Sequence, residues 1–328
     1  MTEKTTYDKP FLTFDEQIKK LKDDYNLKIP NYNNAILLLK DISYYDLING
    51  YKNCFMKDSK YNGTLTIEDL YYFLKYDKNI QNVLLKYALY VENKFKNILA
   101  YVLSSKYGVD VDLYLDPANF RNNGYKINAT IDYIKYRIKN KKYPNPTKHY
   151  INKHNHIPAW ILLRNITFNQ AIDIYNNLFV EDKKEVIKLI SNDLSYNKNS
   201  ISIFKNSIII VRKFRNVIAH NYDFINERTY EKIIRHQLKD SKYNKLITYE
   251  DYKTNLPDNG PYSMVIAISL IMDNYELLNN LYQELIGAMY VMSGNPNLYL
   301  NITETYFDIG GIPYDIDQRL VNQINTLE

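Results

Sequence analysis

Among the polar side chains that interrupt an apolar run between residues 208 and 220, four have types and a spacing that suit chemistry on a phosphate group. If the run is a helix, three of them stack along one stripe with the fourth beside them: Arg212, Asn216 and His220, flanked by Arg215. Polar groups among apolar neighbours lose solvation free energy unless they find partners, so the stripe indicates a cleft or an interface. Histidine transfers protons near neutral pH, and arginine binds phosphate oxygens.

The spacing alone has limited specificity. With eight arginines and five histidines in 328 residues, chance gives an Arg-x4-His roughly 0.1 times, and looser spacings roughly triple that figure. A structural interpretation also explains the pattern: a histidine that caps carbonyl groups at a helix end, and an arginine that extends its charge into solvent. Both interpretations stay open on the spacing alone.

Composition limits the classes of protein that the chain can be. Its 328 residues are 45% hydrophobic, enough for a large core in one or two domains. A net charge of +5 is compatible with a nucleic-acid partner without arguing for one. Cys54 is the only cysteine, which excludes an intramolecular disulfide and a cysteine-rich zinc cluster and favours a reducing cytoplasm. The first residues lack a signal-peptide core, and the longest apolar run, residues 264–272, is typical of a buried helix and too short to cross a membrane.

Helical signals follow one another along the chain. Capping boxes at residues 13–16 and 167–170 each open a helix, and Gly108 is expected to end a long one. Alternating strand patterns are scarce, although residues 298–302 and 306–312 leave room for short strands. The sequence therefore predicts a mainly α fold, with a long polar loop at 140–158 and helices at 14 to just before Pro30, 34–51, a short one from 66, 80–107, 128–139, 168–179, 181–190, 200–221, and from Pro261 to a close at Gly294 and Pro296.

The polar segment at 140–158 is the best basic and aromatic stretch. Its lysines, with Lys139 before them, alternate with tyrosines that stack bases in other proteins, and they favour contact with an RNA backbone: Lys141, Lys142, Lys148 and Lys153, with Tyr143 and Tyr150. A solvated charged loop is the alternative. Three histidines, His149, His154 and His156, lie in the same segment, but no cysteine or carboxylate is close in sequence, so we expect neither a metal site nor a cofactor.

Several separated segments resemble the AbiD/AbiF abortive-infection family of bacterial phage-defence proteins. They are residues 10–18, residues 43–51, and residues 157–160 leading to 167–168. In that family, an arginine, a polar residue and a histidine four to six positions on form the HEPN signature. Arg215, Asn216 and His220 match it residue by residue. Where family members commonly carry an acidic residue after the tryptophan segment, this chain has Arg164.

The resemblance implies an all-α HEPN-type helical bundle with an N-terminal helical extension. We expect an N-terminal region at 1–62, the core at 63–296, and a tail at 297–328 that packs on the core. The implied activity is a metal-independent, cytoplasmic endoribonuclease of phage defence, in which the ribose 2′-hydroxyl attacks the scissile phosphate. His220 would be the general base or acid, Arg215 would bind the phosphate oxygens, and Asn216 would hold His220 or the phosphate, with Arg212 as a further phosphate contact.

Cleavage requires both a base and an acid, so the resemblance also implies a homodimer that pairs two motifs in one cleft. Two alternatives remain. One is an RNA-binding protein that anchors a regulatory non-coding RNA without cutting it. The other is a structural protein whose polar stripe is a buried network at a dimer interface.

Overall fold

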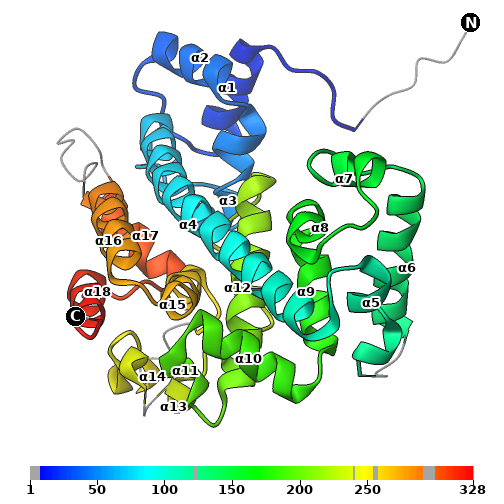
Figure 1. Ribbon diagram of the computed structural model, residues 1–328. Helices are drawn as coiled ribbons and strands as arrows, with labels where there is room; N and C mark the ends of the chain where they lie inside the picture. Colours follow the sequence, from blue (N-terminus) through cyan, green and yellow to red (C-terminus); the bar gives the residue numbers. More distant parts are fainter. Residues whose placement is uncertain (1–7, 122–124, 239–240, 254–257, 291–299, 328) are drawn as a thin grey trace, which may run out of the picture. The chain divides into compact units, whose positions relative to one another are not determined.

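The computed structural model describes residues 8–121, 125–238, 241–253, 258–290 and 300–327, and within them it confirms the all-α fold (Figure 1). These residues form 18 α-helices and no strand. They divide into two compact units, residues 1–80 with 287–309 and residues 81–286 with 310–328. Helix α4 runs without a break from Ile67 to Tyr107, so the division after Ile80 falls within it.

The first unit is built from short helices. The capping box is present, with the Thr13 hydroxyl accepting from the Glu16 N–H at 3.3 Å and a Glu16 carboxylate oxygen accepting from the Thr13 N–H at 2.7 Å. In the core, the two carboxylate oxygens of buried Asp77 accept hydrogen bonds at 2.8 Å from the hydroxyls of Tyr51 and Tyr306. The elements are α1 (Phe14–Asp23), α2 (Tyr32–Asp41), the π-helical turn η1 (Tyr45–Asn49), α3 (Lys52–Phe55), the start of α4 (Ile67–Tyr107) and nearly all of α17 (Ile302–Gly310).

Three expectations are corrected in this unit. The helix expected at 34–51 ends at Asp41, and a separate π-helical turn follows it. The short helix from residue 66 and the long helix from residue 80 are one helix, α4. Residues 306–310 of the segment at 306–312 are the last five residues of helix α17, so they do not form a strand. Residues 298–299 of the other candidate strand lie outside the described residues.

The second unit contains the motif helix and most other helices. Its elements are the remainder of α4, α5 (Val111–Tyr114), η2 (Pro117–Asn119), α6 (Tyr125–Lys139), α7 (Thr147–Lys153), α8 (Ala159–Asn165), α9 (Phe168–Asn177), α10 (Val180–Ile190), α11 (Asn192–Ser195), α12 (Ser200–Ala219), α13 (Arg235–Leu238), η3 (Lys242–Lys245), α14 (Tyr249–Lys253), α15 (Pro261–Met272), nearly all of α16 (Tyr275–Tyr290), and α18 (Ile316–Ile324). The segment expected to be a long loop contains α7. No helix in the described part of the chain is both long and apolar enough to cross a membrane.

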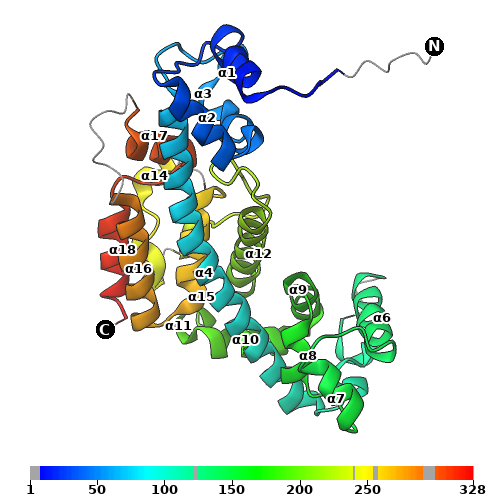
Figure 2. The same ribbon diagram turned by 90° about the horizontal axis from the view of Figure 1, so that it is seen from above.

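The core of this unit joins α4, α9 and α12. The Phe95 ring lies 5.8 Å from that of Tyr175 and 6.0 Å from that of Phe204, and Phe168 completes the cluster. Helix α12 makes its most extensive helix–helix contact with α15, in which every residue is buried. On the other side of α12, α9 packs against both α12 and α6, and it lies between them in both views (Figures 1 and 2).

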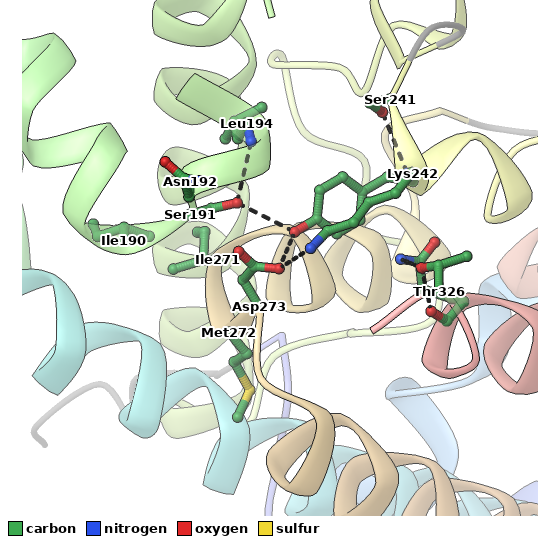
Figure 3. Close-up of polar contacts among 12 residues, drawn as sticks. Ile190, Ser191, Asn192, Leu194, Ser241, Lys242, Ile271, Met272, Asp273 and Thr326 are labelled. Atoms are coloured by element: carbon green, nitrogen blue, oxygen red, sulfur yellow. Dashed lines mark hydrogen bonds and ion pairs between the residues drawn. The ribbon is translucent and has the colours of Figure 1, made fainter. Parts of the chain in front are cut away.

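Half-buried polar groups hold the ends of α10 and α15 in place. The Lys94 ammonium donates to the Ile190, Ile271 and Met272 carbonyls, each at 2.9 Å, and burial lowers the pKa of this lysine. Beside it, the Asp273 carboxylate accepts from the Lys242 ammonium at 2.6 Å, as Figure 3 shows. The Tyr243 hydroxyl also donates to Asp273, at 2.8 Å, and lies 3.3 Å from the Ser191 hydroxyl. Tertiary contacts therefore secure these helix ends.

Asp273 also corrects the expected last helix. Its backbone is in the left-handed region (φ 35°), which ends α15 and lets α16 begin at Tyr275, whereas a single helix from Pro261 was expected. Aspartate tolerates this conformation better than most residues, and here its side chain is held by two partners. Gly294 and Pro296, the expected stop signals, lie outside the described residues.

Replacing Asp273 by asparagine should destabilise the fold in a pH-dependent way. Burial would raise the pKa of the Asp273 carboxyl, but hydrogen bonds from Lys242, Tyr243 and Ser191 outweigh it and hold the pKa below its usual value. A carboxyl with a lowered folded-state pKa stabilises the fold above its unfolded pKa of about 4, and this contribution is lost as the pH falls through the folded-state pKa. We expect Asp273→Asn to lower the free energy of unfolding in urea by about 1–3 kcal/mol at pH 7, and by less below pH about 4.

Glu276→Gln is the matched control, because Glu276 is exposed one turn further along the chain. It should change the free energy of unfolding by less than about 0.5 kcal/mol. An equal loss for Asp273→Asn at pH 7 and at pH 3 would show that the charge of Asp273 contributes nothing.

Candidate functional site

Helix α12 carries the polar stripe on the side that the core leaves uncovered. Its opposite side is buried at Phe204, Ile208, Val211, Phe214 and Ile218. Since the helix continues to Ala219 with His220 as its C-cap, the expected spacing of one turn between the stripe residues holds. Along the uncovered side, Arg212, Arg215 and Asn216 are half-buried, and His220 is exposed.

The Arg215 guanidinium is held from two sides. One terminal nitrogen donates to the Asn216 side-chain oxygen at 3.1 Å, and the other lies 3.6 Å from a carboxylate oxygen of Glu92. The contact between Arg215 and Glu92 is therefore an ion pair, because its distance exceeds that of a hydrogen bond. The Arg215 side chain keeps 31% of its surface exposed, so an incoming anion can reach it.

Glu92 is the acidic member of the site, and it was not among the residues predicted from the sequence. Its other carboxylate oxygen accepts from the Lys96 ammonium at 2.6 Å, and Lys96 also donates to the Ile166 carbonyl at 2.7 Å. Glu92 and Lys96 are both 8% exposed, at positions of α4 that face the core. The sequence signal that could have indicated Glu92 is its spacing, four residues before Lys96 on an otherwise apolar helix face. Two cations share this one carboxylate, so the local charge stays positive and favours an anion.

The end of α12 determines where the His220 side chain emerges. The Tyr222 N–H donates to the Val217 carbonyl at 2.9 Å, and the Asn221 N–H donates to the Ile218 carbonyl at 3.1 Å. This is a Schellman motif, and Asn221 occupies its left-handed position (φ 57°). The His220 ring lies 5.8 Å from the Tyr222 ring, and its nitrogens have no hydrogen-bond partner within the described part of the chain. The imidazole is therefore free to exchange protons with a ligand.

The structure brings together some of the expected residues and separates others. Asn216 contacts Arg215, whereas its contact with His220 is only through the backbone. The Arg212 Nε is buried without a partner among the described residues. The four lysines expected to contact RNA are exposed, but they lie between the end of α6 and the end of α7, away from the stripe: Lys141, Lys142, Lys148 and Lys153.

Tyr143 is a correction. Its ring is 2% exposed, and the Arg137 guanidinium lies over it, 4.6 Å from the ring centre. The ring packs into the second unit because the polar segment folds back onto α6, so Tyr143 cannot stack on a base. In the described residues, no three histidine, cysteine or acidic side chains come together as a metal site.

This arrangement can support proton transfer beside a bound phosphate. Arg215 provides donors with a fixed orientation, and Asn216 and Glu92 keep it on the uncovered side of α12. His220 provides an imidazole five residues further along the chain, at the C-cap of the same helix. Each copy of the chain contributes one imidazole to this stripe.

Asn221 offers a test of how the backbone positions His220. The left-handed conformation destabilises the fold by about 1–2 kcal/mol at a residue with a β-carbon. Glycine does not have this cost, and for asparagine it is smaller. Asn221→Ala should therefore lower the free energy of unfolding by about 1 kcal/mol, while Asn221→Gly should be nearly neutral. Urea unfolding of both variants measures this difference. Equal stability of the two variants would contradict the assigned role of the left-handed backbone.

The comparisons with known proteins agree with the resemblance. The family model described as Abi-like protein matches residues 37–226, more than half of the chain, including α12 with Arg215, Asn216 and His220. No curated protein and no solved structure matches the chain. On the family match, the chain belongs to the Abi-like family of abortive-infection proteins.

Proposed function

We propose that this protein is a metal-independent HEPN-type endoribonuclease that acts in bacterial phage defence. The observation that carries the proposal is the Arg215 guanidinium, held between Asn216 and Glu92 five residues before an exposed His220. Membership of the Abi-like family supports the defence role. The substrate is RNA because it contains its own nucleophile beside the scissile phosphate.

The proposed reaction is a transesterification within the RNA. The 2′-oxygen attacks phosphorus while the bond from phosphorus to the 5′-oxygen breaks. A base removes the 2′-hydroxyl proton, and an acid protonates the departing 5′-oxygen. Arg215 binds the non-bridging oxygens as charge develops on them. The products are a 2′,3′-cyclic phosphate and a 5′-hydroxyl.

A homodimer supplies the second proton-transfer group. One His220 cannot at once remove one proton and deliver another, and each stripe contains one imidazole. Two copies related by a two-fold axis would bring both stripes to one substrate. The exposure of His220 and Tyr222, with Tyr222 65% exposed, is compatible with a surface that a second copy covers.

An RNA-binding role without cleavage is the second candidate. The exposed lysines of the α6–α7 region favour it, because they provide backbone contacts away from the proposed reaction site. In that case a regulatory RNA would bind and remain intact. Cleavage assays separate the two functions.

Single substitutions at the stripe should abolish cleavage and keep the fold. Purified protein is incubated with mixed RNA, and products are resolved by electrophoresis and end-group analysis. Because general acid–base catalysis contributes about 10²–10⁴-fold, His220→Ala should slow cleavage by at least about 100-fold, and Arg215→Ala by a similar factor. EDTA should have no effect, and DNA of the same sequence should stay intact.

Lys213→Ala is the matched control, because Lys213 is on the same helix but pairs with Glu227 at 3.3 Å. Its cleavage rate should be close to that of the unmodified chain. Undiminished cleavage by His220→Ala would remove the proposed catalytic role, and RNA binding without any cleavage would select the second candidate.

Mixing experiments test the shared site. If activity needs His220 from two copies, adding excess His220→Ala protein to the unmodified chain should suppress cleavage, because mixed dimers contain one imidazole. Sedimentation velocity should show a dimer in each sample. Cleavage that is unaffected by excess variant would show that each copy acts alone.

A further inference from the structure

Positive charge is concentrated in one part of the chain. Residues 133–172 contain no aspartate or glutamate and eight lysines or arginines: Lys135, Arg137, Lys139, Lys141, Lys142, Lys148, Lys153 and Arg164. The whole chain has a net charge of +5, so the residues outside this stretch sum to −3. A polyanion is therefore attracted to this stretch in preference to the rest of the chain.

The same stretch lines a cavity of about 480 Å³ that no proposed step uses. Its apolar surface comes from Val111, Ile138, Ile151 and Ile157, and its polar rim includes Lys135, Lys139 and His154. Helix α9 lies between α6, on which this cavity opens, and α12, so the cavity is separate from the Arg215 stripe (Figures 1 and 2). Cavities of this size accommodate ligands as large as a nucleotide.

An aromatic platform forms one side of the cavity. The Tyr150 and His154 rings are stacked, with centres 4.3 Å apart and planes 26° from parallel. The His149 ring meets His154 edge-on at 5.3 Å. His154 is exposed, so a base in solution can reach its ring. Successive aromatic faces beside lysines are the arrangement by which proteins bind unpaired bases.

The charges on the rim are not uniform. Asp112 pairs with Lys135 at 2.8 Å, and Asp110 accepts the Asp112 N–H at 2.9 Å at the start of α5. These carboxylates repel phosphate but can accept hydrogen bonds from ribose hydroxyls. Lys139, on the α6 side, has no ion-pair partner among the described residues. Phosphates would therefore lie along the lysine side, with the ribose toward α5.

From this geometry we infer that the cavity between α5, α6 and α7 binds a nucleotide of single-stranded RNA, with its base stacked on His154 and its phosphate beside Lys139. This inference rests on the proposed function in one respect, which is that the bound polyanion is RNA. It adds a second RNA contact, which holds the strand independently of Arg215 and His220.

Binding is measured on the full chain carrying His220→Ala, so that cleavage does not interfere. A fluorescein-labelled ten-nucleotide RNA of mixed sequence is titrated, and fluorescence anisotropy gives Kd over a series of salt concentrations. Loss of one base stack should weaken binding by about ten-fold in His154→Ala. Lys139→Ala should weaken binding and reduce the slope of log K against log salt by about 0.7.

Lys188→Ala, an exposed lysine on α10, is the matched control and should leave Kd within two-fold. Emission from Trp160, the single tryptophan, together with thermal unfolding, checks that each variant is folded. Three results would overturn the inference: no binding of the RNA, pocket variants that bind as tightly as the control, or equal affinity for DNA of the same sequence. Because all samples lack His220, failure of the nuclease proposal would not affect this measurement.

Discussion

The candidate site depends on one buried carboxylate, that of Glu92. It is removed from water at a core-facing position of α4, where an unpaired charge would be strongly destabilising. Lys96 compensates it and is itself secured by the Ile166 carbonyl, just before the capping box that starts α9. The other carboxylate oxygen of Glu92 forms an ion pair with the Arg215 guanidinium at 3.6 Å. This contact orients the guanidinium but leaves some of its N–H donors available. Those donors can then bind a phosphate group.

Around this contact, the second unit is organised to keep α12 in a fixed position. The Phe95 cluster joins α4, α9 and α12, and α15 covers the opposite side of α12 with a fully buried helix. The ends of α15 and α10 are in turn held by Lys94 and Asp273. Helix ends leave carbonyl groups without partners, and a half-buried ammonium that donates to three of them connects the helices more specifically than apolar packing does. The polar stripe is thus carried on a rigid support.

The two proposed RNA contacts differ in their physical character. The α12 stripe has few charges, and Asn216 and Glu92 hold the one at Arg215 in place. The α6–α7 region has many exposed lysines around a cavity with an aromatic side. Long-range attraction scales with accumulated charge, whereas catalysis needs a few donors at fixed positions. Separation by α9 lets each region meet its own requirement.

Periodicity and capping signals were sufficient to predict the all-α fold and the helix that carries the polar stripe, because a helix is specified by local spacing and by residues at its ends. The boxes at Thr13 and Thr167, the stop at Gly108 and the one-turn spacing of Arg212, Asn216 and His220 all depend on neighbours in the chain. Contacts between distant residues decided the rest. Asp273 ends α15 because Lys242 and Tyr243 hold its carboxylate, and Tyr143 is buried because α6 provides a place for its ring. Glu92 and Arg215 are 123 positions apart in the sequence. Their ion pair forms only when the chain folds, so no local sequence pattern predicts it.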